Sequence, residues 1–237
     1  MAGLALDGSN PDVDVLGGIN GLAKDAPHWI NRVMEYLGEY GIIAALAILC
    51  LIAWWAARKR PDAPVAVAGL VWAPLAAGIA LLVNIPIRAF VERPRPFKEH
   101  AGLEVLIPGK TDFSFVSDHA TLTMAVAVGL FIAHRKIGLV GLGLALLEGF
   151  CRVYMGVHYP TDVIGGFALG TAVALLLAPL AQAALVPLTE AVGRSRAAAL
   201  VRAPGAAEEP EQGPGPVVPA GSAVPPRAGE RDSDLAA

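Results

Sequence analysis

Long apolar runs alternate with short polar stretches along this chain. Five of the runs are each close to the ~20 residues that an α-helix needs to cross ~30 Å of hydrocarbon. They cover about 38–57, 65–88, 118–134, 137–155 and 162–186. The pattern predicts a membrane-spanning helix in each run.

The ends of the chain follow different patterns. Trp29, Ile30, Val33, Met34 and Leu37 recur at helical spacing and predict an amphipathic helix in the membrane interface. The alternative is that this segment also crosses the membrane. After about residue 203 the sequence is rich in Pro, Ala, Gly and Glu, which is typical of a disordered tail. We therefore expect an N-terminal segment at 1–37, a transmembrane domain at 38–190 and a cytoplasmic tail at 191–237.

Composition supports this division. Of the 237 residues, 55% are hydrophobic and 16% are charged, and the mean hydropathy is +0.56. These values are wrong for an ordinary soluble domain and typical of an integral membrane protein. The predicted fold class is an all-α, polytopic membrane bundle of about five transmembrane helices with an N-terminal interfacial helix. A net charge of −3 argues against nucleic acid as a partner.

Basic residues in the short loops predict the orientation of the bundle. They follow the first, third and fifth runs, as Arg58-Lys59-Arg60, His134-Arg135-Lys136, and Arg194, Arg196 and Arg202. Placing all of them in the cytoplasm is consistent with five crossings and a cytoplasmic C-terminus. The loops at about 89–117 and 156–161 then lie together on the outer face.

Those outer loops carry three polar blocks, which run from Arg88 to Pro96, from Ser117 to His119 and from Arg152 to Asp162. Arginines on this side run against the charge rule and therefore indicate ligand binding. Guanidinium groups bind phosphate oxygens bidentately and stay charged at any working pH. Anchoring to lipid headgroups is the alternative, and the sequence assigns Arg93 and Lys98 no more than that.

The second and third blocks add acid–base groups. Ser117 and Asp118 open a helix, and a helix N-terminus attracts anions. His119 at the same helix end can protonate a leaving oxygen. His158 is followed four residues later, across a turn, by Asp162. A carboxylate there can hold one ring nitrogen and leave the other free as a nucleophile or base.

Together the blocks resemble the type 2 phosphatidic acid phosphatase superfamily. Its pattern is Lys or Arg, six residues, Arg-Pro; then Pro-Ser-Gly-His; then Ser-Arg, five residues, His, three residues, Asp. The matching positions, with every internal spacing intact, are Arg88, Arg95-Pro96, Ser117, His119, Arg152, His158 and Asp162. The resemblance covers roughly residues 15–190.

Three positions depart from that pattern. Val116 replaces the proline and Cys151 replaces the serine, and both positions are expected to shape or pack the site. Asp118 stands where glycine is usual. The Ser-Asp-His form is similar to the bacitracin-resistance type of undecaprenyl pyrophosphate phosphatase, as is the run 156–163.

The resemblance implies a metal-independent lipid phosphatase without a cofactor, on the outer face of a bacterial plasma membrane. His158 would form a phosphohistidine, Asp162 would orient it, and His119 would act as acid and then base. The phosphoryl oxygens would be held by Arg88, Arg95, Ser117, Arg152 and the backbone at Asp118 and His119.

The resemblance also implies the substrate, undecaprenyl diphosphate, which is hydrolysed to the monophosphate that recycles the cell-wall carrier lipid. One alternative is a phosphatidate or phosphatidylglycerophosphate phosphatase. Another is a non-catalytic binder or transporter of lipid phosphates. The oligomeric state stays open.

Overall fold

The computed structural model describes residues 10–204, and within them every regular element is a helix. In chain order these are α1 (Pro11–Asp25), α2 (His28–Tyr36), the π-helical η1 (Leu37–Gly41), α3 (Ile42–Ala57), α4 (Ala63–Val91), α5 (Pro96–Glu99), α6 (Asp118–Ala133), α7 (Arg135–Tyr154), α8 (Pro160–Leu176), α9 (Ala178–Gly193) and η2 (Ala198–Leu200). The predicted all-α class is confirmed. Residues 1–9 and 205–237, which belong to the predicted N-terminal segment and tail, lie outside the described residues.

Each of the first four predicted spans falls on one helix, and the fifth falls on two. By length and hydropathy, the helical segments that can cross a membrane are His28–Ala57, Ala63–Glu99, which contains α4, and α7. The pair α8 and α9 passes the same test together and is bent by 52°. The remaining apolar helix, α6, is shorter, with 16 residues.

Two element boundaries differ from the prediction. The amphipathic segment α2 continues through η1 into α3 as one helix, so it makes no separate crossing. The fifth predicted span is broken between α8 and α9 because Pro179 has no backbone N–H to donate and its ring opposes a continuous helix. Pro179 instead lies in the first turn of α9, where a proline is tolerated.

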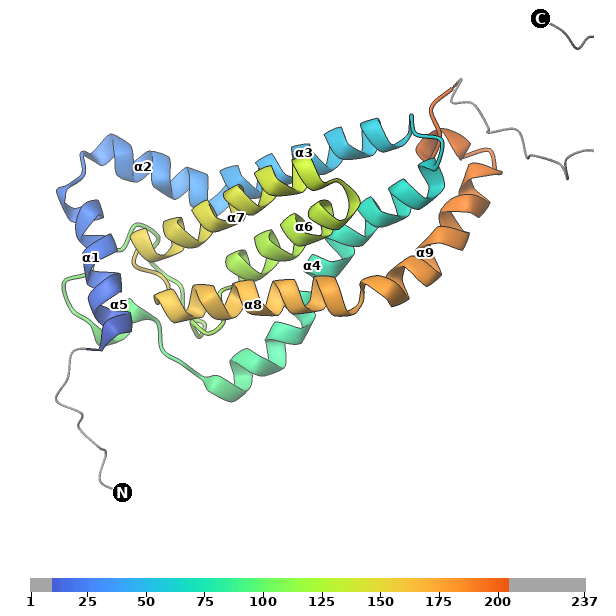
Figure 1. Ribbon diagram of the computed structural model, residues 1–237. Helices are drawn as coiled ribbons and strands as arrows, with labels where there is room; N and C mark the ends of the chain where they lie inside the picture. Colours follow the sequence, from blue (N-terminus) through green and yellow to red (C-terminus); the bar gives the residue numbers. More distant parts are fainter. Residues whose placement is uncertain (1–9, 205–237) are drawn as a thin grey trace, which may run out of the picture. The chain divides into compact units, whose positions relative to one another are not determined.

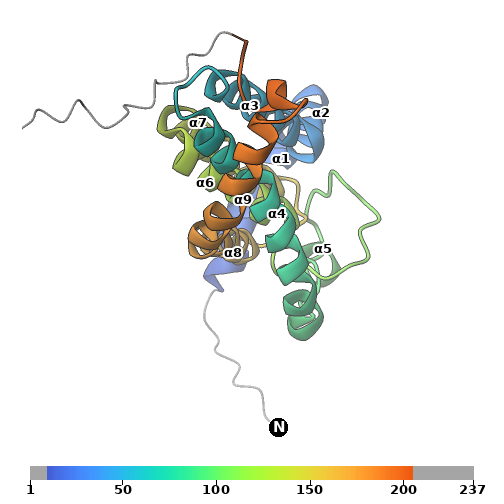
Figure 2. The same ribbon diagram turned by 90° about the vertical axis from the view of Figure 1, so that its right-hand side faces the viewer.

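Helix α6 is the centre of the bundle. It packs against α4, α7 and α8 and also contacts α3. Figure 1 shows these helices side by side, and Figure 2, which looks along them, shows α6 between α7 and α8. The side chains buried around α6 are mostly small, such as Ala73, Ala76, Ala125 and Ala127. Small side chains let helix backbones approach closely, which is how membrane helices gain packing energy.

Helices α6 and α8 also approach each other closely. A Cβ added to Gly170 would lie 2.4 Å from the carbonyl oxygen of Thr121, and one added to Gly166 would lie 2.8 Å from that of Ser117. The backbone N–H of Ser117 also donates to the carbonyl of Asp162 at 3.1 Å. The two helix N-termini are therefore locked together.

Helix α1, which the hydropathy pattern does not predict, lies across one end of the bundle (Figure 1). Its buried Asn20 donates to the carbonyls of Glu104 and Tyr154, each at 2.8 Å, and accepts from the N–H of Glu104 at 2.8 Å. One side chain thereby connects α1 to both the loop before α6 and the end of α7.

The described part of the predicted tail, residues 191–204, packs back onto the bundle. The indole N–H of Trp54 donates to the carbonyl of Leu200 at 2.9 Å, and the N–H of Ala203 donates to the carbonyl of Arg58 at 2.8 Å. Val201 is buried there. These contacts lie at the opposite end of α3 from α1.

The contact between α6 and α8 gives a stability prediction. We expect Gly170→Ala to destabilise the protein by about 1–3 kcal/mol, because the new methyl group must push two backbones apart. Gly143→Ala is the matched control, since a Cβ on that glycine of α7 meets nothing within 4 Å. Thermal unfolding in detergent would measure both variants, and an equal melting temperature for both would contradict this account of the contact.

Candidate active site

Every residue of the three predicted blocks lies at the end of the bundle that α1 covers. This end is formed by the C-terminal ends of α4 and α7, the N-termini of α6 and α8, and the loop between α5 and α6 (Figure 1). Segments that are far apart in the chain thus meet at one place, as the sequence predicts.

His158 and Asp162 form a buried pair. Asp162 lies in the first turn of α8, where one oxygen, Oδ2, accepts from the N–H of Tyr159 at 2.9 Å. The same oxygen lies 3.5 Å from Nδ1 of His158. The opposite ring nitrogen, Nε2, lies 3.3 Å from Nη1 of Arg95. The imidazole is therefore oriented with Nδ1 toward a carboxylate and Nε2 toward a guanidinium.

Burial sets the charge of this imidazole. His158 is only 3% exposed. Burial, together with the charges of Arg95 and Arg152, lowers the pKa of His158 to about 4, although the Asp162 carboxylate acts in the opposite direction. At neutral pH the ring is uncharged. Nε2, which faces the donor Nη1 of Arg95, then carries the lone pair.

Arg95 is buried beside His158. It donates through Nη1 to the carbonyl of Val157 at 2.9 Å, and through Nη2 to both carboxylate oxygens of Asp112, at 2.8 and 2.9 Å. Burial alone would raise the pKa of Asp112, but the Arg95 guanidinium holds it below its usual range. Asp112 thus presents two anionic oxygens to Arg95 in the geometry that a phosphate would use.

Arg88 lies on the other side of Asp112. It is paired with that carboxylate at 3.3 Å and, more closely, with Asp118. Asn84 donates to Asp118 as well, at 2.7 Å. The unusual acidic residue of the second block is therefore balanced by a cation and an amide.

Ser117 caps the helix that carries His119. Its Oγ accepts from the N–H of Ala120 at 3.4 Å, and the residue is fully buried. Ser117 is thus the N-cap of α6, which agrees with the prediction that a helix opens here. Two further hydroxyls hold the first turns of α6, since Thr121 donates to the Ser117 carbonyl and Thr123 to the His119 carbonyl.

Arg152 and His119 meet at a carboxylate that the sequence prediction missed. Glu39 accepts from Nη1 and Nη2 of Arg152 at 3.1 and 3.2 Å, lies 3.9 Å from Nε2 of His119, and accepts from Lys110 at 3.3 Å. Arg152 is fully buried and also pairs with Glu148, one turn earlier in α7, at 3.5 Å. Glu39 belongs to η1, so the first long helix also reaches the site.

The two histidines lie beside different arginines. His158 contacts Arg95 at 3.3 Å, and His119 shares the Glu39 carboxylate with Arg152. The charge of Arg152 also lowers the pKa of His158. Among residues 10–204, no three His, Cys, Asp or Glu side chains converge as metal ligands.

The missed residues differ in the signal that they leave in the sequence. Glu39 is the only charged residue of the apolar run at 38–57, which is a usable signal for a functional group inside a membrane helix. Asp112 and Lys110 lie in a loop with no local pattern. Arg93 was assigned to the lipid interface, but it contacts Asp162 at 2.8 Å.

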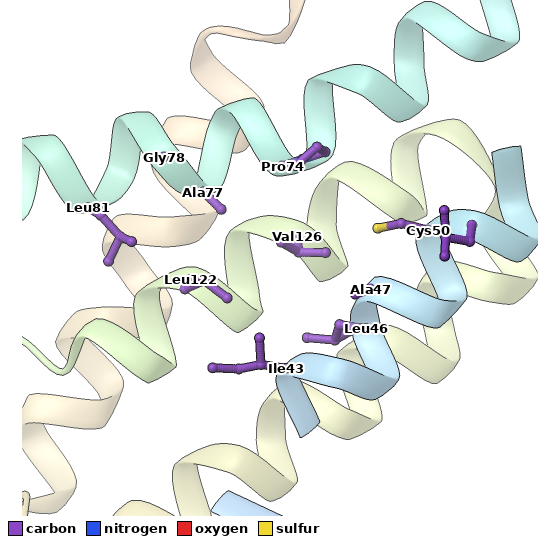
Figure 3. A pocket seen from close by; sticks show the side chains of 11 residues that line it. Ile43, Leu46, Ala47, Cys50, Pro74, Ala77, Gly78, Leu81, Leu122 and Val126 are labelled. Carbon is purple, nitrogen blue, oxygen red and sulfur yellow. The ribbon is translucent and has the colours of Figure 1, made fainter. Parts of the chain in front are cut away.

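An apolar groove leads away from the arginines. Arg88 and Asp118 line one end of a cavity of about 530 Å³, together with Gly78, Leu81, Leu82 and Ile85. Gly78 and Leu81 also line an adjoining cavity of about 500 Å³ between α3, α4 and α6 (Figure 3). That second cavity is lined by apolar residues alone, among them Ile43, Cys50 and Val126. A continuous apolar path thus begins at the charged end.

The model of the PAP2 superfamily matches residues 69–185. The chain belongs to this superfamily, and to its membrane lipid phosphatases.

Three relatives illustrate the range of the superfamily. The undecaprenyl-diphosphatase BcrC of Bacillus subtilis is 34% identical over 148 residues, which cover 62% of this chain and 72% of that protein. The decaprenylphosphoryl-5-phosphoribose phosphatase of Mycobacterium tuberculosis is 34% identical, over 70% of this chain and 88% of that protein. The crystal structure of a transmembrane PAP2-type phosphatidylglycerolphosphate phosphatase from Bacillus subtilis aligns with a TM-score of 0.54 and 25% identity, over 74% of this chain and 89% of that one.

The buried His158 gives a prediction for pH dependence. On the acidic side of the profile, we expect kcat/KM to fall as the pH drops through about 4, where the imidazole of His158 in the free enzyme takes up a proton. Rates would be measured against pH and expressed per fully ionised substrate, which removes the substrate's own titration. A half-maximal point near the ordinary histidine pKa of about 6.5 would contradict the effect of burial.

Proposed function

We propose that this protein hydrolyses a polyprenyl diphosphate, of which undecaprenyl diphosphate is the expected case, to the monophosphate through a phosphohistidine. The observation that carries the proposal is the orientation of His158. Its buried ring has one nitrogen toward Asp162 and the other toward Arg95. An uncharged imidazole aimed at a phosphate-binding guanidinium suits attack on phosphorus.

In the first step the Nε2 lone pair of His158 bonds to the terminal phosphorus. The bond from that phosphorus to the bridging oxygen breaks, and the lipid monophosphate leaves with the electron pair and a proton from His119. The positive charge that develops on the imidazole is balanced by Asp162. In the second step water loses a proton to His119 and attacks phosphorus, the N–P bond breaks, and inorganic phosphate leaves.

The guanidinium groups supply the electrostatic stabilisation. Arg88, Arg95 and Arg152, with the backbone N–H groups at Asp118 and His119 and the N-cap Ser117, hold the phosphoryl oxygens as charge develops on them. In the substrate-free site, Asp112 accepts hydrogen bonds from Arg95 and Glu39 accepts them from Arg152. Substrate phosphates replace those carboxylates, which lie at 45% and 20% side-chain exposure and have room to move toward water.

Two observations support a lipid diphosphate. The apolar groove that begins at Arg88 and Asp118 is suited to a hydrocarbon tail. The Ser-Asp-His block and the similarity to an undecaprenyl-diphosphatase favour the diphosphate headgroup. The second candidate is a phosphatidylglycerophosphate or phosphatidate phosphatase, which is favoured by the similarity to a solved phosphatidylglycerolphosphate phosphatase.

We also propose that the site faces outward from a bacterial plasma membrane. The basic residues at 58–60 and 134–136 lie at the turns between α3 and α4 and between α6 and α7, at the end of the bundle away from the site. Such residues favour the cytoplasmic side. The proposed orientation places the C-terminus in the cytoplasm.

A substrate panel tests the proposal. We expect purified protein to release phosphate from undecaprenyl diphosphate faster than from phosphatidate or phosphatidylglycerophosphate, and His158→Ala to lose at least about 1,000-fold in kcat, because no other group in the proposed site replaces the nucleophile. A chelator should leave the wild-type rate unchanged. Faster turnover of phosphatidate would reject the diphosphate, and undiminished release by His158→Ala would reject the nucleophile.

The groove gives a separate prediction about tail length. Gly78 lies ten residues before Arg88 in α4, or about 15 Å along the helix, and a Cβ there meets nothing within 4 Å. We expect Gly78→Leu to lower kcat/KM for undecaprenyl diphosphate by about tenfold, because the side chain fills the path of the tail. Geranyl diphosphate is too short to reach Gly78, so its turnover should not change.

Gly143→Leu on α7 is the matched control, since its Cβ position is also open. This variant should leave both substrates unaffected. Equal loss on the long and the short substrate in Gly78→Leu would contradict a tail in this groove.

A further inference from the structure

Arg93 lies between α4 and α5 and is shared by two carboxylates. Its Nη1 donates to Oδ1 of Asp162 at 2.8 Å and to Oγ1 of Thr161 at 2.7 Å. Its Nη2 donates to Oδ2 of Asp12 at 2.7 Å. The guanidinium also stacks 3.7 Å from the ring of Tyr159. These contacts hold the guanidinium plane in one orientation.

Asp12 brings α1 into this network. Its two oxygens also accept from the N–H of Thr161 at 2.9 Å and from its hydroxyl at 2.6 Å. Burial alone would raise the pKa of Asp12, but the hydrogen bonds from Thr161 and Arg93 leave it below its usual range. Asp12 lies outside residues 69–185, which the superfamily model matches.

The oxygens of Asp162 are divided between two tasks. Oδ1 is bound by Arg93, whereas Oδ2 accepts from the N–H of Tyr159 and faces Nδ1 of His158. Asp162 is fully buried, so its rotamer is set by these contacts rather than by water. Removal of the donor to Oδ1 frees the carboxylate to rotate, and the face that it presents to His158 is then no longer defined.

We propose that Arg93 is a positioning residue for the nucleophile, acting through Asp162, and that Asp12 of the N-terminal helix holds Arg93 in place. This inference rests on the proposed role of His158 and extends it to a three-residue relay, from Asp12 to Arg93 to Asp162. The relay joins α1, the segment before α5 and the start of α8.

Arg93 differs from the arginines proposed to hold phosphate. The partner of Arg95, Asp112, has 45% of its side chain exposed and can be displaced by substrate. The partners of Arg93 are 0% exposed for Asp162 and 11% exposed for Asp12. Loss of Arg93 from these contacts would leave the buried carboxylate of Asp162 without this counter-charge, which is energetically unfavourable. Arg93 therefore keeps its contacts with Asp162 and Asp12 during turnover.

The relay also affects the electrostatic potential at His158 and therefore its affinity for a proton. The groups that act on this imidazole are Asp162 from α8, Arg95 from the segment before α5, Arg152 from α7 and His119 from α6. Arg93 neutralises the far side of Asp162. Without it, the carboxylate attracts a proton on His158 more strongly. Without Asp12, Arg93 carries an uncompensated charge, which has the opposite effect.

Kinetics of full-length variants test the positioning role. We expect Arg93→Met to lower kcat by about 10- to 100-fold with little change in KM, because the nucleophile is misplaced while phosphate binding is intact. Arg93→Lys keeps the charge and should recover part of the loss. Asp12→Asn should lower kcat by less, and the double variant should be no worse than Arg93→Met, because Asp12 acts only through Arg93.

Arg60→Met is the matched control. It removes an arginine from a similar Arg–Asp pair, with Asp62 at 2.8 Å, at the other end of the bundle. This variant should keep the wild-type kcat. A normal kcat in Arg93→Met, or a raised KM with kcat unchanged, would overturn the proposal, and the second result would make Arg93 a phosphate ligand.

NMR titration of the ¹⁵N-labelled imidazole of His158 in detergent gives a readout that needs no substrate. We expect the pKa of His158 to rise in Arg93→Met and to fall or stay unchanged in Asp12→Asn. Partial unfolding would raise it in both variants. Equal shifts in both would overturn the relay. If wild type releases no phosphate yet the opposite shifts are seen, the proposed function fails while the relay stands.

Discussion

The constraint on which this structure depends is the placement of arginines at the end of an apolar bundle. A charged group in such surroundings is stable only when an opposite charge and hydrogen bonds compensate it. Four arginines are each paired with a carboxylate from a distant part of the chain. They are Arg88, Arg93, Arg95 and Arg152. The pairs therefore tie together segments that hydrophobic packing alone would leave free to slide. Stability and the preparation of an anion site are here the same set of contacts.

Close backbone packing makes this arrangement precise. Glycines 166 and 170 bring α8 against α6 so tightly that the N-cap Ser117 donates its N–H to the carbonyl of Asp162. The capping turn of α8 then sets Asp162 beside His158. A small change in the distance between these helices would move the imidazole relative to the arginines. The packing of the bundle therefore also sets the geometry of the proposed nucleophile.

Much of this could be predicted from the sequence, because hydropathy and motif spacing are local signals. The five apolar runs all fall on helices, and the three polar blocks meet at one end of the bundle as their alternation with spans implies. Helix α1 was missed because it is not apolar enough for a span, and its attachment depends on one buried amide, Asn20. Three carboxylates were missed, those of Glu39, Asp112 and Asp12. Each meets its arginine only through the tertiary fold, and no local sequence pattern shows such a pairing. Arg93 was placed at the lipid surface for the same reason.

The carboxylate partners fall into two classes that differ in exposure. Asp112 and Glu39 are partly exposed and lie on the arginines proposed to bind phosphate, so they are suited to exchange with a substrate anion. Asp12 and Asp162 are shielded and hold an arginine that no phosphate needs to reach. Exposure of the partner, rather than the identity of the arginine, therefore separates the binding cations from the positioning one. Because α1 supplies the partner Asp12, the proposed site begins before residues 69–185, which the superfamily model matches, and it includes the N-terminal helix.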